Sequence, residues 1–219
     1  MYRIRMHAVT LGLVFLTTTT ILAQTGEGPR KNEIGLVIGA TETPGIDKIS
    51  GGSINLNSSL ALGAEYDRQL LGKCTTLFLG AGFLASPADV KVSYPPSVVS
   101  PEYAYLFLSP HIKLRFNSTR TLQPWLSFGG GYADFAPASP KSGNVNVKGQ
   151  GNSGTLEFGG GVDTGPLIQF KRVPLLKNSP IGGRLEVRDF YSGQPHYGVE
   201  TRGVFQNNLA FTAGLLIRF

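Results

Sequence analysis

Histidine is the side chain most often used as a general base, and two of the chain's three histidines lie beyond its first few residues. His111 belongs to a segment in which apolar and polar residues alternate. Its parity places it on the face of that segment that would point into the interior of a β-barrel. His196 lies between Ser192 and Glu200 in a loop-like stretch, where a serine, a histidine and an acid could serve nucleophilic chemistry. Such a cluster arises readily by chance in a loop. We therefore expect no catalytic residue, a hydrogen-bonded His111 and a solvated His196.

Metal-ligand and phosphate-binding motifs are also missing from the sequence. No HExxH motif is present, and no set of His, Cys and Asp has the spacing of metal ligands. The glycine triplets 129–131 and 159–161 match neither the G-x-x-x-x-G-K-[ST] nor the G-x-G-x-x-G phosphate-binding motif, and neither triplet opens a predicted helix. We therefore expect these glycines to line a narrow barrel interior. Cys74 is the single cysteine, which excludes an internal disulfide. We expect no metal and no cofactor.

The N-terminus has the pattern of a secretory signal peptide. Arg3 and Arg5 precede an uncharged stretch, 8–23, that ends in a small residue, and a polar segment follows it at 24–32. The stretch is short and contains four consecutive threonines, which argues against an uncleaved membrane helix. We predict a signal peptide over 1–23, cleavage between Ala23 and Gln24, and a short N-terminal segment over 24–32.

Charge and hydropathy narrow the class of the mature chain. Removing 1–23 leaves 18 Lys and Arg against 14 Asp and Glu, with no basic cluster, which is too mild a charge for nucleic-acid binding. No stretch after Gln24 approaches the roughly 20 apolar residues of a spanning helix. Strands that alternate apolar and polar residues contain no long apolar stretch. The observation therefore does not exclude a membrane β-barrel.

Alternation with period two is the dominant pattern, because one parity is apolar and the other small or polar. Most segments approach the about 9–11 residues with which a tilted strand crosses a bilayer. The sequence therefore predicts an all-β fold, an up-and-down antiparallel transmembrane β-barrel of about eight strands over 33–219. The predicted strands are 33–41, 53–68, 74–85, 102–116, 122–135, 155–164, 181–191 and 205–219.

The predicted connections alternate in length, as external loops and periplasmic turns do in outer-membrane barrels. The connection 165–180 breaks this alternation, since it is long where a short turn is expected, and the sequence offers no account of it. Short connections are 70–73 and 117–121, and long ones are 42–52, 86–101, 136–152 and 192–204.

The two faces of the strands favour a membrane barrel over a soluble one, because a soluble barrel would face water with many Lys and Glu. Here the polar face is mostly Gly, Ser, Thr, Asn and Ala, which suits a narrow lumen. Aromatic residues of the apolar face form two bands, as interfacial anchoring requires. One band is Tyr66, Phe116 and Phe219, and the other is Phe83, Tyr132, Tyr191 and Phe205.

Charged residues of the inward parity predict a plugged lumen. Six acids and five bases nearly cancel, which is what buried charges need, and a barrel of about eight strands leaves room only for side chains. The predicted lumen charge network consists of Glu33, Glu65, Asp67, Lys113, Arg115, Glu157, Asp163, Arg184, Glu186, Arg188 and Arg218.

The C-terminal segment resembles the β-signal of outer-membrane barrels, with Thr212 as the polar position, Gly214, the apolar Ile217 and a terminal aromatic, Phe219. The segments 158–163 and 183–191 resemble the sixth and seventh strands of the OmpA-like outer-membrane β-barrel family. The resemblance implies a Gram-negative outer-membrane location, contact with membrane lipid and lipopolysaccharide, and recognition by the outer-membrane assembly machinery. No peptidoglycan-binding domain accompanies it.

These observations predict a non-enzymatic barrel with a structural or surface-interaction role through its long loops. Its loop ligand cannot be named from the sequence. One alternative is a lipid A-modifying barrel enzyme that uses His and Ser, and a less favoured one is a soluble exported ligand-binding barrel. Because one fold supports many functions, the surface role rests on the family resemblance.

Overall fold

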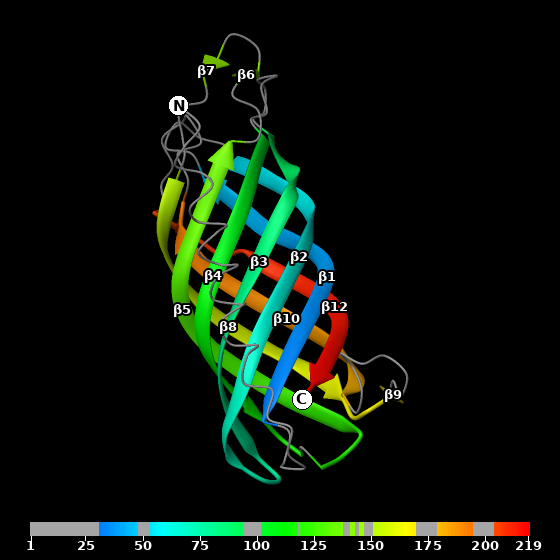
Figure 1. The fold of residues 1–219 in the computed structure, drawn as a ribbon. Helices are drawn as coiled ribbons and strands as arrows, with labels where there is room; N and C mark the ends of the chain where they lie inside the picture. The colour runs from blue at the N-terminus through cyan, green and yellow to red at the C-terminus, as the bar shows by residue number, and fades with distance from the viewer. Residues whose placement is uncertain are drawn as a thin grey trace, which may run out of the picture.

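The structure, a computed structural model, describes residues 31–47, 53–93, 102–117, 119–137, 141–142, 145–146, 151–169, 179–194 and 204–219. Eight long strands form a closed antiparallel barrel, in which each strand pairs with the next and the last pairs with the first (Figure 1). The predicted all-β, eight-stranded, up-and-down barrel is thereby confirmed. The strands are β1 (Asn32–Asp47), β2 (Ser53–Gly72), β3 (Thr76–Ser93), β4 (Glu102–Arg115), β5 (Leu122–Pro137), β8 (Gly151–Thr164), β10 (Pro180–Gly193) and β12 (Leu209–Arg218).

Four two-residue strands complete the described elements. β6 (Lys141–Ser142) pairs with β7 (Val145–Asn146), while β9 (Ile168–Gln169) and β11 (Phe205–Gln206) each pair with β10. β9 lies in the connection that the sequence left unexplained, and it folds back along the start of β10. The described residues contain no helix with the length and apolar character needed to cross a membrane.

The two ends of the barrel differ in their connections. The bends at 73–75 and 116–121, the start of β1 and the end of β12 lie together at one end, which we call the turn end. The other end, the loop end, carries the connections between β1 and β2, β3 and β4, β5 and β8, and β10 and β11. The turn end lies at the lower part of Figure 1.

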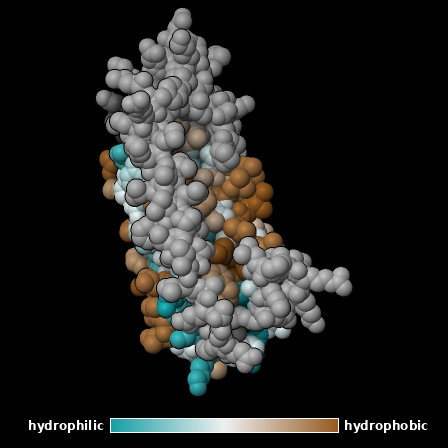
Figure 2. Space-filling model, in the orientation of Figure 1, coloured by the Kyte–Doolittle hydropathy of each residue, from teal (hydrophilic) through white to brown (hydrophobic). Residues whose placement is uncertain are grey.

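Alternation places apolar side chains on the outside of the barrel. On β1, Leu36 and Ile38 are 46% and 54% exposed, whereas Val37 between them is buried. The same holds around the ring, and Figure 2 shows hydrophobic residues along the sides of the molecule. An exterior of exposed Leu, Ile, Val and Phe is the reverse of a water-soluble surface.

The two aromatic bands follow the same parity. At the loop end, Tyr191 and Phe205 are exposed, and their rings stack with centroids 5.4 Å apart. Phe83 and Tyr132 are also exposed on the outer face near this end. At the turn end, Tyr66, Phe116 and Phe219 are half-buried. Each band therefore contributes aromatic rings to the outer surface.

Several strands extend beyond their predicted ends. β1 and β3 continue to Asp47 and Ser93, past the predicted limits at 41 and 85. Backbone pairing continues there, although bulges interrupt it and the apolar–polar alternation has faded. The apolar–polar alternation arises because one face of a strand contacts an apolar environment. It therefore cannot indicate the parts of a strand where neither face does so.

The first turn lies later in the chain than predicted. The predicted turn at 70–73 is mostly strand, because β2 runs to Gly72, and Cys74 lies exposed in the bend instead of opening a strand. Gly72 has a φ of 101°, and a Cβ there would meet the Thr75 carbonyl oxygen at 1.9 Å. Glycine adopts this conformation without steric cost, so it fixes where the turn begins.

The last predicted strand is interrupted at Asn207 and Asn208, which separate β11 from β12. The Asn208 side chain donates to the Phe190 carbonyl oxygen at 2.7 Å, and its backbone N–H donates to Asp189 Oδ1 at 3.2 Å. Side-chain bonds thus replace part of the backbone ladder at this point.

Candidate functional site: the barrel lumen

The structure places all eleven sequence-predicted charges on the inner face of the barrel. Ten of them are buried, and Arg218 at the turn end is half-buried. They come from β1, β2, β4, β8, β10 and β12, so six strands contribute to one cluster. Charges buried at this density persist only where each is paired, and the contacts below show how the pairing is achieved.

Glu33 is the centre of the turn-end group of charges. Its Oε1 accepts from Lys113 Nζ at 2.7 Å and lies 3.5 Å from Arg184 Nη2, and Arg115 Nη2 also donates to it. Its Oε2 lies 3.8 Å from Arg218 Nε. One carboxylate therefore serves four bases from three different strands.

Asp163 completes the turn-end group. Arg184 binds it in parallel, with Nε to Oδ1 at 2.6 Å and Nη2 to Oδ2 at 2.9 Å. Arg115 Nη2 donates to Oδ2 at 2.6 Å, and Trp125 Nε1 donates to Oδ1 at 3.1 Å. This bidentate geometry is the strongest form of an arginine–carboxylate pair.

Arg188 is the centre of a second group, nearer the middle of the barrel. Its Nη1 lies 3.1 Å from Glu157 Oε1, its Nη2 lies 3.0 Å from Glu186 Oε2, and Nη2 also contacts Glu65. Glu186 accepts a further bond from the Thr212 hydroxyl at 2.8 Å. Glu65 also contacts Arg184 and thereby joins the two groups into one network.

His111, Glu65 and Asp67 have the geometry of a metal-binding set within the described strands, since their ligand atoms all lie within 4.8 Å of one another. His111 Nε2 contacts Asp67 Oδ1 at 2.8 Å, and Lys113 Nζ forms an ion pair with Asp67 Oδ2. The two oxygens of Glu65 face Arg184 and Arg188. Every carboxylate oxygen of the set is already occupied by a cation or an imidazole, so internal bases stand where a metal ion would.

Two inward aromatic rings, which are not among the predicted lumen residues, lie beside these charges. Arg115 lies 4.5 Å from the centroid of the buried Phe78 ring, and Arg184 lies 5.1 Å from that of Trp125. Both rings have the inward parity of their strands, which was the available signal. Cation–π contacts of this kind favour keeping the guanidinium groups in a desolvated interior.

A layer of aromatic rings closes the lumen above the charges, toward the loop end. Phe107 stacks on Phe190 with centroids 4.5 Å apart and planes 11° apart, and Phe135 meets Phe107 edge-on at 5.8 Å. Tyr105 adds a fourth ring at 5.3 Å from Phe107. Smaller apolar side chains fill the space around them and complete one hydrophobic cluster, namely Val37, Ala61, Leu84, Ala133 and Ala210.

Hydroxyl groups form a further layer on the loop-end side of these rings. The Tyr105 hydroxyl is hydrogen-bonded with Ser59 Oγ at 3.0 Å and with Thr41. Ser86 donates to Ser59 at 2.8 Å. The lumen is therefore filled successively by charges, aromatic rings and hydroxyl groups.

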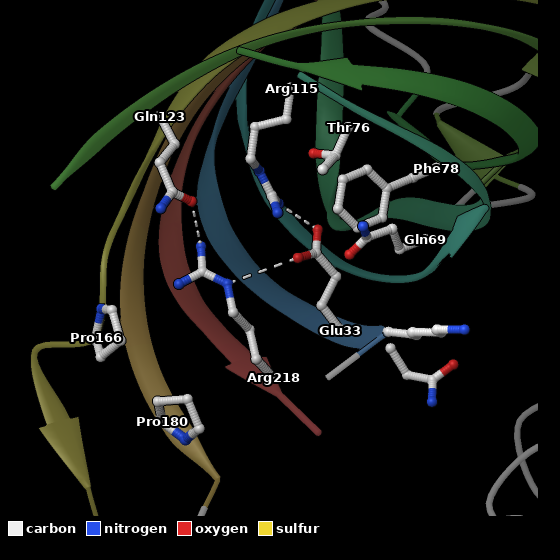
Figure 3. A pocket seen from close by; sticks show the side chains of 11 residues that line it. Glu33, Gln69, Thr76, Phe78, Arg115, Gln123, Pro166, Pro180 and Arg218 are labelled. Atoms are coloured by element: carbon white, nitrogen blue, oxygen red, sulfur yellow. Dashed lines mark hydrogen bonds and ion pairs between the residues drawn. The ribbon is translucent and has the colours of Figure 1, made fainter. Parts of the chain in front are cut away.

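A cavity of about 220 Å³ opens at the turn end beneath the charge network (Figure 3). Glu33, Arg115 and Arg218 line it, and Gln123 accepts a hydrogen bond from Arg218 Nη2 at 2.9 Å. The buried network forms its inner wall, so the cavity is a vestibule and not a channel.

The remaining sequence-predicted residues are dispersed. Ser192 is buried and accepts a bond from Asn208 Nδ2 at 3.0 Å, whereas His196 and Glu200 lie outside the described residues. Both ring nitrogens of His111 contact acceptors that are not hydroxyls, Asp67 and the Ser109 carbonyl oxygen. Among the described residues, His111 is therefore not hydrogen-bonded to a serine hydroxyl.

The residues of the β-signal pattern lie on or next to β12, the strand that closes the ring against β1. Thr212 points into the lumen, and Gly214 pairs with Val37. Ile217 pairs with Ile34, and the Phe219 N–H donates to the Asn32 carbonyl oxygen at 2.9 Å. Ala23 and Gln24 lie outside the described residues.

Comparisons with known proteins agree at the level of the fold. No family model matches the sequence, and no curated protein matches it. Neisserial surface protein A, with a TM-score of 0.50 and 11% identity, covers 88% of this chain and is itself covered to 100%. OprG of Pseudomonas aeruginosa, also with a TM-score of 0.50 and with 14% identity, covers 88% of this chain and is covered to 98%. The predicted resemblance to small outer-membrane β-barrels is confirmed as a shared fold.

Proposed function

We propose that this chain is a Gram-negative outer-membrane β-barrel with a closed lumen, and that it acts without catalysis through the connections at its loop end. Its contacts are membrane lipid and lipopolysaccharide around the barrel. The proposal includes export by cleavage between Ala23 and Gln24, and recognition of the C-terminal β-signal by the assembly machinery.

The filled lumen is the observation that carries the proposal. The buried charge network and the aromatic layer each span the interior, so an ion would have to displace paired charges and then cross stacked rings. Water-filled barrels have more strands and a wider interior. A role as a pore for passive diffusion of solutes is therefore disfavoured, and the connections at the loop end are the surface through which we propose the protein acts.

The exterior supports the membrane setting. Large apolar side chains are exposed on every strand of the ring, and aromatic bands lie near both ends. A soluble barrel exposing this much apolar surface would aggregate. The two fold relatives named above support the same setting by analogy of fold.

Single-channel recording of the full refolded chain in a planar bilayer tests the closed lumen. We expect no large, steady conductance, with a wide porin as the positive control. A stable open level of porin size would falsify the closed-lumen proposal.

Mass spectra of lipid A from cells with and without the gene test the absence of catalysis. We expect identical acyl-chain composition. A gene-dependent change would instead favour the lipid A-modifying enzyme, and His196→Ala with Ser192→Ala would then show whether those residues take part.

A further inference from the structure

Among the side chains that the structure describes, the charges on the outside of the barrel differ in sign between its two ends. At the turn end, Arg68, Lys73 and Arg120 are exposed, and Lys31, which lines the vestibule, is exposed as well. Among the described residues, the acidic side chains at that end are Glu33 and its neighbours in the network, all of them turned into the lumen. No ion pair engages Arg68, Lys73 or Arg120 within the described part of the chain. The turn end therefore presents an uncompensated positive rim.

The outer charged side chains that the structure describes at the loop end are acidic. Glu42 is exposed on the outer face of β1, and Asp134 and Asp189 are half-buried on the outer faces of β5 and β10. No basic side chain accompanies them among the side chains that the structure describes there. The described outer side chains therefore differ in charge between the two ends of the barrel.

The position of Arg68 shows what kind of partner can reach the rim. It lies on the outer face of β2, two residues from Tyr66 and two from Leu70, whose side chain is 51% exposed. Tyr66 is fixed by a 2.8 Å hydrogen bond from its hydroxyl to Asn32 Oδ1. A guanidinium flanked by an interfacial tyrosine and a leucine faces the membrane, where lipid headgroups supply the available anions.

We propose that Arg68, Lys73 and Arg120 form a cationic rim that binds anionic phospholipid headgroups in the leaflet at the turn end. The inference rests on the proposed function, because it requires a bilayer around the barrel. Each base near an anionic lipid surface strengthens lipid association by roughly fivefold. The bases lie on β2 and in the two bends at 73–75 and 116–121, so they engage lipids along the β2–β5 side of the ring. Figure 2 shows hydrophilic residues at this lower end of the molecule, below the apolar sides.

The experiment measures lipid selectivity around the folded full chain with spin-labelled lipids. The chain is inserted into phosphatidylcholine vesicles, and the motionally restricted fraction is compared for labelled phosphatidylglycerol and labelled phosphatidylcholine. We expect a severalfold preference for phosphatidylglycerol that falls as salt is raised. The triple variant R68Q/K73Q/R120Q should lose this preference. The control K48Q/K91Q/K141Q should keep it, because it removes the same charge at three positions that belong to the loop end.

Folding and insertion are checked separately, by heat-modifiable migration and protease protection in pure phosphatidylcholine. A folded, inserted parent without phosphatidylglycerol preference, or a folded triple variant that retains it, overturns the cationic rim and leaves the proposed function standing. A parent chain that does not insert into the phosphatidylcholine bilayer overturns both the cationic rim and the proposed function.

Discussion

Arg184 and Asp163 form a bidentate ion pair inside the barrel, with contacts of 2.6 and 2.9 Å across strands whose two residues are direct partners in the ladder. Arg115 and Trp125 share the same carboxylate. This one acid therefore ties β4, β5, β8 and β10 together in the interior.

Asp163→Asn should lower the free energy of unfolding by about 3–5 kcal/mol, because two buried guanidinium groups each lose one of their charged partners. Urea unfolding in lipid vesicles, followed by the fluorescence of the single tryptophan, Trp125, measures it. Asp189→Asn is the matched control, since that carboxylate faces outward and accepts from the Asn208 backbone. Equal stability of the two variants would contradict the prediction.

Glu186 and Arg188 should respond very unequally to neutralisation. Glu186→Gln leaves Arg188 with Glu65 and Glu157, keeps an oxygen for the Thr212 hydroxyl, and leaves five acids facing five bases. Arg188→Met leaves three acids around an apolar side chain. We expect Arg188→Met to be less stable than Glu186→Gln by about 3 kcal/mol in the same urea assay. Similar values would mean that water, not Arg188, neutralises the central group.

The aromatic layer should contribute to stability independently of the charges. Phe107→Ala removes the ring stacked on Phe190 and should cost about 3–5 kcal/mol through the cavity that it leaves. Phe128→Ala is the control, because Phe128 pairs with Phe158 on the outer face at 5.2 Å. The Phe107→Ala barrel should still not conduct, since the charge network remains in place. A conducting variant would show that the rings alone close the lumen.

Deleting Phe219 should reduce the amount of folded barrel in the outer membrane and increase periplasmic degradation. The residue ends the β-signal pattern and its N–H bonds to the first strand at Asn32. Quantitative blotting of the heat-modifiable form measures the effect, with Leu215→Ala on the outer face of β12 as control. Unchanged levels in the deletion would remove Phe219 as an assembly determinant.

The mature protein should begin at Gln24. N-terminal sequencing or intact mass of protein from the outer-membrane fraction measures this directly, and Ala23→Arg should block processing because the site requires a small residue. Mature protein that starts at Met1 would be inconsistent with the predicted export route.

Parity accounts for most of what the sequence could predict about this barrel. It gives the side of the wall on which Glu33 and Arg184 lie, because strand side chains alternate strictly. It cannot show that these two residues, 151 positions apart, meet in the lumen, since that depends on the stagger of all eight strands. Phe107 and Phe190 have the same inward parity, but most inward residues are small or polar, so nothing in the sequence indicates that these two rings stack.

The distribution of the lumen charges along the chain determines when they can be neutralised during folding. The pair β1–β2 carries three lumen acids and no lumen base, and β3–β4 carries Lys113 and Arg115 without an acid. The pair β5–β8 again carries only acids, and β10–β12 has an excess of two bases. Successive hairpins therefore alternate in sign, so each attracts both of its neighbours in the ring. A single hairpin inserted alone would bring unpaired charges into lipid. We therefore expect a folding pathway in which the ring closes before water leaves its interior.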